Sequence, residues 1–302
     1  MPGSDPPPNL QNADCCLELN CHNKYKILNF SPAISGGLIL GMLNFILAIK
    51  SIWKREVIRY LRDKARIAST LFQPLMFLVI FGTGLRQTMA GGSLGIDFLK
   101  FMYPGIIAMS VMGVAFFSTI STVWDREFGF LREILVAPVS RVSIVMGKIL
   151  GAVSIAATQA LILLVLAPFI GLKIGVLLIL QLFVFMLLLA FAIAGLGLLI
   201  ASLMRTTESF GFVMQVLIFP MFFLSGAFFP LTAAPGWMLW LSQISPLTYG
   251  VDGMRQIILD AQMSHEAVSK IVLYPIHIDV LLLIIFSLIT ISAATIVFNR
   301  RE

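Results

Sequence analysis

The stretch best suited to recognising another molecule is short and charged: residues 125–141 read DREFGFLREILVAPVSR between two long apolar segments. The apolar side chains that share one side of a helix at this spacing are Phe128, Leu131, Ile134 and Leu135. Pro138 ends the helix near Ala137, because proline disfavours the α region for the residue before it. Such a helix either lies flat on a membrane surface or fits a groove on a partner protein. The chemistry predicted for this stretch is therefore binding.

The sequence shows no phosphate-binding loop. Its Gly147-Lys148 pair has Val142 where a P-loop needs its first glycine and Ile149 where the loop needs serine or threonine. If the protein runs on ATP, the ATPase is another chain. Three cysteines near the N-terminus lack the matching His/Cys cluster of a zinc site: Cys15, Cys16 and Cys21. We expect neither a cofactor nor a metal.

Two further classes of function need reactive or ionisable groups inside a membrane. Secondary transporters usually keep ionisable residues at mid-membrane depth, whereas Glu208 and Asp279 lie at the ends of the expected spans. An intramembrane serine protease needs a base within reach of its serine, and nothing in the sequence brings Ser225 and His277 together. A secondary transporter or channel remains the alternative to the function reached below, and a serine protease the remote one.

Composition places the chain in a membrane. Of its 302 residues, 59% are hydrophobic and only 12% are charged, and the mean hydropathy is +0.96. A soluble domain carries roughly 25% charged residues, so this chain has too little polar surface to face water. The net charge of +6 is spread beside apolar runs, and we expect no nucleic-acid partner. The sequence predicts an all-α integral membrane protein.

Hydropathy divides the chain into a tail, a surface helix and a membrane domain. Residues 1–32 are polar and lack aliphatic periodicity, which predicts a disordered cytoplasmic tail. Residues 33–66 are expected to form an interfacial helix, and residues 67–302 a transmembrane domain. The six expected spans are 67–86, 100–124, 142–170, 174–204, 210–231 and 276–298.

Lysine and arginine predict the orientation of these spans. With six spans, sixteen of the 21 basic residues fall on the side of both termini and the 125–141 loop, and five fall on the other side. The positive-inside rule therefore predicts that both termini and this loop are cytoplasmic.

The segment before the first expected span has two contrasting faces. Its apolar stripe consists of Ile49, Trp53, Val57, Tyr60 and Leu61. Its basic face consists of Lys50, Lys54, Arg55, Arg59 and Arg62. A basic amphipathic helix of this kind lies in the interface of an anionic leaflet, so membrane lipid is an expected partner.

The longest outer segment, residues 232–275, is unusually apolar for a loop. Trp237 and Tyr249 recur in short apolar runs that Pro235 and Pro246 interrupt. Short, proline-punctuated helical pieces predict a re-entrant or interfacial hairpin at the outer face.

Three pieces of the sequence together resemble one family. Residues 127–141 followed by Gly147-Lys148, then residues 219–231, then Pro235, Trp237 and residues 244–249, are similar to the type-2 ABC exporter permeases of the bacterial drug-resistance and nodulation-factor export type. Residues 55–56 ahead of residues 74–75 and 81–82 fit the same pattern. The resemblance covers about residues 44–299.

The resemblance implies a multi-pass subunit of a bacterial inner membrane. It would pair with a second permease chain, as a homodimer if one gene serves both halves, and with two cytosolic ATP-binding-cassette ATPase subunits. The loop between the second and third spans would carry a coupling helix that seats in the ATPase. The coupling residues that it implies are Phe128, Gly129, Phe130, Leu131, Arg132, Glu133, Leu135, Ala137 and Pro138. The cargo would be amphipathic or lipidic, such as a drug, a lipid or a lipid-linked glycan, and the outer hairpin would cap the exit.

Overall fold

The structure is a computed structural model that describes residues 37–84, 98–136, 139–170, 175–260 and 272–301. The chain divides into two units, Met1–Leu43 and Asn44–Glu302. Of the first unit only residues 37–43, the start of a helix, are described. The expected tail, residues 1–32, lies outside the described residues. The packing reported below is that of the second unit.

All regular elements in the described part of the chain are helices, which confirms the expected all-α class. The longer helices are α2 (Gly37–Arg62), α3 (Lys64–Gly84), α5 (Phe98–Ser118), α8 (Arg141–Leu166), α9 (Val176–Leu203), α10 (Thr207–Leu224), α12 (Pro246–Asp260) and α14 (Ile276–Arg301). The shorter ones are α6 (Ile120–Glu127), α7 (Phe130–Val136), η3 (Ala167–Ile170), η4 (Leu231–Ala233) and α11 (Gly236–Ser242).

Five of the described helices are long and apolar enough to cross a membrane: Phe101–Glu127, Arg141–Leu166, Val176–Leu203, Thr207–Leu224 and Ile276–Arg300. They correspond to the second through sixth expected spans. The first of the five combines α5 and α6, which a single turn at Thr119 separates. Helix α3 lies where the first span was expected but is not among the five, so a sixth span remains a prediction.

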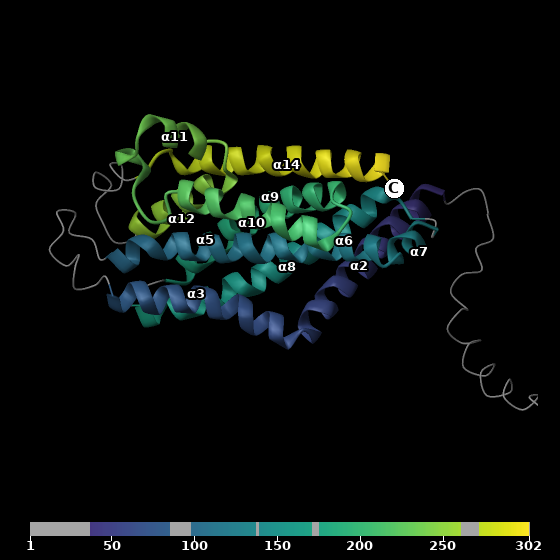
Figure 1. Cartoon of the computed structure of the whole chain (residues 1–302), viewed down its shortest axis with the longest axis horizontal. Coiled ribbons are helices and arrows are strands. Elements are labelled where there is room, and N and C mark those ends of the chain that lie inside the picture. The colour runs from purple at the N-terminus through teal and green to yellow at the C-terminus, as the bar shows by residue number, and fades with distance from the viewer. Residues whose placement is uncertain (1–36, 85–97, 137–138, 171–174, 261–271, 302) are drawn as a thin grey trace, which may run out of the picture. The chain divides into compact units, whose positions relative to one another are not determined.

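Helix α9 is the centre of the bundle, since it contacts α5, α8, α12 and α14 (Figure 1). Glycines permit two of its close approaches. A Cβ added at Gly195 would lie 2.5 Å from Thr290 Oγ1 of α14, and one at Gly197 would lie 2.8 Å from Thr119 Oγ1. Small residues that let backbones approach are typical of helix packing in membranes. Here they serve contacts within one chain.

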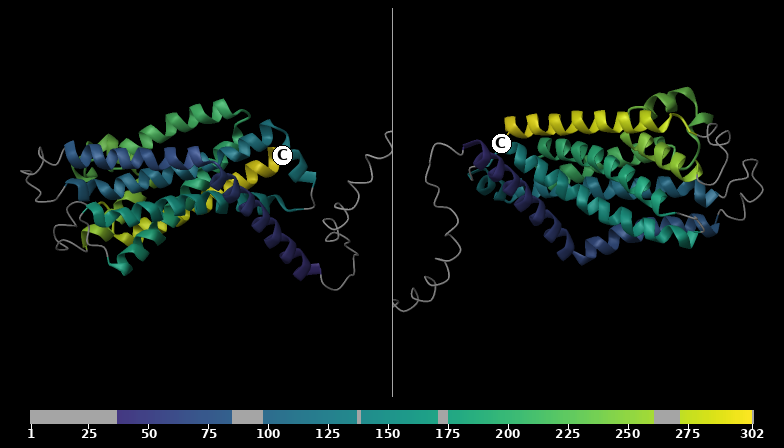
Figure 2. Two further views of the ribbon diagram at one scale, coloured as in Figure 1. Left: turned by 90° about the horizontal axis from the view of Figure 1, so that it is seen from below. Right: turned by 180° about the vertical axis from the view of Figure 1, so that it is seen from behind.

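The two ends of the bundle carry different elements. Helices α11 and α12 lie at one end, and α6, α7 and the C-terminal end of α14 lie at the other (Figure 1). Both views of Figure 2 keep the end of α14 beside the α6–α7 loop. The charged loop and the C-terminal end of α14 therefore lie at the same end of the bundle, and the cytoplasmic orientation of that end remains a prediction.

Residues 44–62 of α2 pack against the bundle at this end. The side chains that form the buried face of this segment are Ala48, Ile52, Glu56 and Tyr60. Opposite them are Gly147 and Gly151 of α8, where added Cβ atoms would lie 2.8 Å from Ile52 Cβ and 2.7 Å from Glu56 Cβ. The buried face thus differs from the expected stripe, because Leu61 is exposed and a carboxylate lies near its middle.

Candidate functional site

The α6–α7 loop turns sharply at a glycine. Helix α6 ends at Glu127, and the N–H groups of Phe128 and Gly129 donate to the carbonyls of Trp124 and Arg126. Gly129 has a φ of 80°, a left-handed conformation that glycine adopts without the Cβ penalty of other residues. Helix α7 begins at the next residue. Gly129, expected as part of the coupling segment, therefore sets the direction in which α7 leaves the bundle.

The structure separates the expected coupling residues into two groups. Phe128 and Phe130 are 69% and 51% exposed, and Val136 is exposed beyond them. Leu131 is buried in the core of this chain, and Leu135 is partly buried against that core. The side chain of Arg132, and all of residues 137–138, lie outside the described part of the chain, and Glu133 is exposed.

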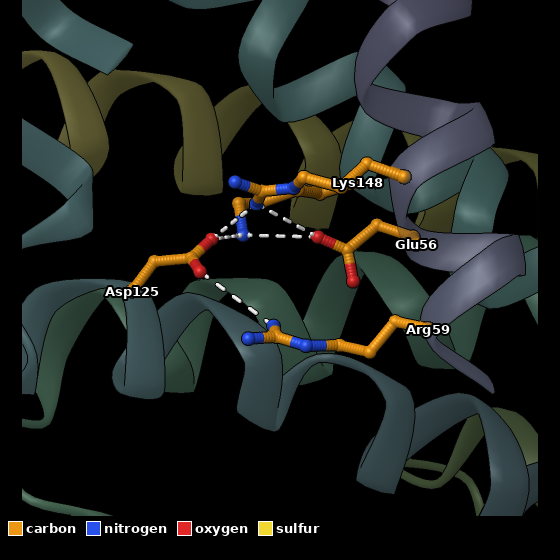
Figure 3. A network of polar contacts seen from close by, with 5 residues as sticks. Glu56, Arg59, Asp125 and Lys148 are labelled. Carbon is orange, nitrogen blue, oxygen red and sulfur yellow. Dashed lines mark hydrogen bonds and ion pairs between the residues drawn. The ribbon is translucent and has the colours of Figure 1, made fainter. Parts of the chain in front are cut away.

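Immediately before this loop, a buried network of charges joins three helices (Figure 3). Asp125 of α6 accepts from Lys148 Nζ of α8 at 2.7 Å. Glu56 of α2 lies 3.5 Å from the same Nζ and 3.1 Å from Arg55 Nη2. Arg55 also pairs with Asp125, and Arg59 Nη1 lies 3.6 Å from Asp125 Oδ1. Two carboxylates thus share three cations.

The network satisfies groups that would be costly to bury alone. Glu56, Asp125 and Lys148 are at most 5% exposed, and a buried charge needs paired, hydrogen-bonded partners. Burial by itself would raise the pKa of Glu56, but Lys148 and Arg55 outweigh it and hold that pKa below its usual range. Glu56 is therefore ionised at neutral pH, and the network joins α2 to both helices that flank the loop.

The two residues after Asp125 contact the segment in which α9 ends and α10 begins. Arg126 donates to the carbonyls of Ala201 and Ser202 at 3.1 and 3.3 Å and also to that of Met204, all at the end of α9. Glu127 accepts from the backbone N–H of Thr207, at 3.1 Å, and from its hydroxyl, at the start of α10. Three consecutive residues, 125–127, therefore contact four other helices.

The expected interfacial-helix residues have different surroundings. Arg55 and Arg59 belong to the charge network, and Arg59 also lies over the Trp124 ring at 5.5 Å. Trp53 donates its indole N–H to Ser154 Oγ of α8 at 2.9 Å. Lys54 and Arg62 are exposed. Two of the five basic residues expected on this face, Arg55 and Arg59, thus bind within the chain.

The expected outer-hairpin residues lie in two successive helices at the opposite end. Pro235 precedes α11, and Pro246 is the buried first residue of α12. Trp237 is 64% exposed, whereas Tyr249 is buried and donates its hydroxyl to the carbonyl of Gln243 at 2.6 Å. Two short helices, α11 and α12, are present here, and a hairpin at the membrane interface remains a prediction.

Sequence reasoning missed the charge network. It assigned neither Glu56 nor Asp125 to a site, and it used Lys148 only in the failed phosphate motif and in the family resemblance. A signal was available, because Lys148 follows the start of an apolar span by half a dozen residues and a charge there requires a partner. The partners themselves, Glu56 and Asp125, could not be named from the sequence, because they depend on how α2 and α6 pack against α8.

The serine of the protease alternative has a structural environment. Ser225 is 1% exposed, and its hydroxyl donates to the carbonyl of Phe222 at 2.7 Å. No histidine contact to it occurs among the described residues. A hydroxyl engaged in this way lacks the adjacent base that a nucleophile needs.

Long apolar helices and a charged loop at one end define a multi-pass membrane protein. Residues 47–259 match the family described as ABC-2 type transporter, and the chain belongs to that family. The chain is thus a membrane subunit of an ABC transporter, a family that generally works with an ATP-binding cassette subunit.

Curated relatives agree with this assignment. A protein of Cyanophora paradoxa named as a transport permease, ycf38, is 29% identical over 81% of this chain and 87% of its own length. Nodulation protein J of Rhizobium meliloti is 30% identical over 71% of this chain and 82% of its own. The inner membrane transport permease YadH of Escherichia coli is 28% identical over 69% and 81%.

Proposed function

We propose that this chain is the permease subunit of an ABC exporter, in which ATP hydrolysis by separate ATPase subunits drives outward movement of an amphipathic or lipidic substrate. The proposal places the protein in a bacterial inner membrane with six spans and both termini in the cytoplasm. Two permease chains and two ATPase chains would form the working complex. The α6–α7 loop is the proposed ATPase-coupling element.

The observation that carries this proposal is that the α6–α7 loop exposes apolar side chains and is itself attached to the bundle by several contacts. Phe128, Phe130 and Val136 are exposed. They belong to α7 and the turn before it, at the bundle end that also carries the end of α14. Large exposed apolar side chains mark interaction sites, and aromatic anchors dominate many interfaces. Leu131 and the contacts of residues 125–127 attach the same loop to the bundle, so a load on this surface would reach the membrane helices.

The coupling residues take different parts in this proposal. Phe128 and Phe130 are the proposed anchors in the ATPase groove, with Arg132 and Glu133 as polar contacts. Leu131 and Leu135 hold α7 on its own chain, in place of the partner contact that the sequence had suggested for them. Ala137 and Pro138 would end α7.

A second permease chain is proposed to cover one face of α10. Only 22% of the most apolar stretch of α10 is buried, against 72% for Phe101–Glu127. Gln215 is exposed in the middle of that helix, beside Phe212 and Val216. A side-chain amide facing hydrocarbon lacks hydrogen-bond partners, and polar residues in spans usually bind across helices. A homodimer with two-fold symmetry would provide that cover.

In this proposal one end of the membrane domain contacts lipid headgroups through α2, and the other end closes the exit of the transport pathway. Lys54 and Arg62, which are exposed, would face anionic headgroups beside α2. The α11–α12 hairpin, with Trp237 and Trp240 exposed, would sit at the outer interface and close the exit of the pathway.

Substitution of Phe130 tests the coupling assignment. We expect Phe130→Ala to weaken binding of the ATPase by about 2 kcal/mol or more, because truncating a buried aromatic anchor has that cost at interface hot spots. The measurement is recovery of the ATPase with tagged permease from membranes that contain equal amounts of permease. Insertion should be unaffected, since Phe130 is 51% exposed and lies outside the expected spans.

Val142→Ala is the matched control, because Val142 is similarly exposed at the start of α8 and has no proposed contact. It should recover the ATPase at the wild-type level. Equal recovery with Phe130→Ala, together with unimpaired export, would overturn the coupling assignment. A wild-type permease that brings down no ATPase would contradict the proposed function itself.

A further inference from the structure

Arg126 and Glu127 occupy an unusual position, because two adjacent residues of opposite charge contact two adjacent helix ends. Helix α9 ends at Leu203 and α10 begins at Thr207, so only residues 204–206 separate them. Arg126 binds the carbonyls that end α9, and Glu127 binds the N–H and hydroxyl of the first residue of α10.

The charges match the helix ends that they contact. The last carbonyls of a helix lack intrahelical partners and carry partial negative charge, which favours a cation. The first N–H groups lack partners and carry partial positive charge, which favours an anion. At the start of α10 the Thr206 side chain accepts from the Ser209 N–H at 3.3 Å. The carboxylate of Glu127 accepts from the Thr207 N–H. Exchanging the two charges would place each against a like partial charge.

Helix α10 is the more easily displaced of the two helices. It is 22% buried in its most apolar stretch, compared with 39% for α9, which lies at the centre of the bundle. Its N-terminal region contacts α6, the helix that ends in Glu127. A helix with little packing within its own chain can shift at small cost, provided that something holds its end.

We propose that Arg126 and Glu127 are positioning residues that transmit displacement of the α6–α7 loop to the α9–α10 turn. Arg126 anchors the loop on the end of α9, and Glu127 moves the N-terminus of α10 with the loop. This inference rests on the proposed function, because the displacement comes from the ATPase. Movement of the loop would then reach α10 directly through Glu127. It would not have to pass along the span Phe101–Glu127, which ends in the loop.

The test uses the full permease–ATPase complex in lipid nanodiscs and needs no knowledge of the substrate. Replacement of Cys15, Cys16 and Cys21 by serine leaves the permease without a native thiol, and labelling is read on the permease alone. Phe212→Cys then reports on α10, since Phe212 is 71% exposed in the single chain. Movement of α10 would alter the access of reagent to this position whether lipid or the proposed second permease chain lies against it. The rate of thiol labelling is measured with and without ATP plus vanadate, beside ATP hydrolysis, ATPase recovery and thermal stability.

We expect nucleotide to change the labelling rate when residues 126–127 are native. Glu127→Gln should abolish that change while ATP hydrolysis and ATPase recovery stay at the wild-type level. Thr207→Val, which keeps the backbone N–H but removes the hydroxyl donor, should reduce the change and decides the question if Glu127→Gln does not fold. Glu208→Gln is the matched control, because this neighbouring carboxylate is exposed and should leave the change intact.

The outcomes separate the possible failures. The inference would be overturned if nucleotide changed the labelling rate fully in both Glu127→Gln and Thr207→Val. It would also be overturned if nucleotide left the labelling rate unaltered in a permease with native residues 126–127. If Glu127 had a merely structural role, Glu127→Gln would lower thermal stability and the yield of complex. The nucleotide-dependent change in labelling rate of each intact complex would then stay unaltered, and that result also overturns the inference. Failure of the native permease to recover an ATPase would instead refute the proposed function.

Discussion

Asp125 is the residue on which the contacts of this end of the bundle converge. Its carboxylate pairs with Lys148 of α8 and with Arg55 and Arg59 of α2, and it is 1% exposed. A buried ion pair is weak evidence of net stabilisation, because desolvation offsets the attraction. Removing Asp125 is different, since Lys148 would stay buried with Glu56, 3.5 Å away, as its one remaining partner in the network. The network therefore fixes which helices meet here more than it adds to stability.

Asp125→Asn should destabilise the permease by about 3 to 5 kcal/mol, the usual cost of breaking a buried pair from one side. The substitution preserves shape but leaves Glu56 as the single carboxylate for three cations. Thermal unfolding of purified permease, followed by tryptophan fluorescence, measures the effect as a lowered midpoint. Lys148→Met should cost less than Asp125→Asn, because Asp125 would keep both arginines.

Glu208→Gln is the control for charge removal, because its carboxylate is exposed at the start of α10. It should shift the midpoint little, as surface substitutions usually do. If Asp125→Asn unfolds at the wild-type midpoint, the network is dispensable and the packing of α2 must depend on its apolar contacts.

At the scale of elements, α2 is held by shape as well as by charge. Gly147 and Gly151 lie one helical turn apart on α8, and each leaves room for one α2 side chain, Ile52 or Glu56. This small-xxx-small spacing is typical of closely packed membrane helices. The close approach brings Glu56 within reach of Lys148, which lies between the two glycines in sequence.

Gly151→Ala should therefore lower the midpoint of unfolding and loosen α2. Its new Cβ would lie 2.7 Å from Glu56 Cβ, so α2 would have to move away and the ion pair with Lys148 would lengthen. Limited proteolysis at the basic residues of α2 is the measurement, with faster cleavage expected in Gly151→Ala.

Gly113→Ala is the matched control within a span, because nothing lies within 4 Å of a Cβ at Gly113. It should be neutral or stabilising, since alanine favours helix over glycine by about 1 kcal/mol. Equal proteolysis rates for the two alanine variants would show that α2 does not depend on this contact.

At the scale of the whole molecule, one chain leaves polar groups exposed on apolar helices. Gln215 of α10 is the clearest example, since its neighbours Phe212 and Val216 are exposed as well. A second copy related by a two-fold axis would bring two such faces together. The complete complex would then hold two permease chains of 33.2 kDa each.

Gln215→Cys, in the background without native cysteines, should form cross-linked permease dimers with a short bifunctional thiol reagent in membranes. Leu288→Cys on α14 is the control, because Leu288 is 62% exposed within a span but outside the proposed interface. Cross-linking is read as the fraction of permease at twice the monomer mass. Equal yields at the two positions would contradict an interface on α10, and a transporting complex with one permease chain would contradict the dimer.

Much of this architecture could be predicted from the sequence, because hydropathy and helical periodicity are local properties. The positions of five spans, the end of α7 and the short helices α11 and α12 follow from runs of apolar residues and from proline and glycine. The family resemblance rested on the same local motifs and is confirmed. These features require no knowledge of which helices touch.

Only the tertiary structure decided which faces meet, and that changed the roles of individual residues. The family resemblance implied that Leu131 contacts the ATPase together with Phe130, yet Leu131 is buried in its own chain, where α7 packs against α6. Arg55 was expected on a basic face toward lipid and Glu56 had no expected contact, yet they meet Asp125 and Lys148, 69 or more residues later. Pairings between distant segments depend on how helices cross, and the crossing is set by the glycines and side-chain volumes of both partners together.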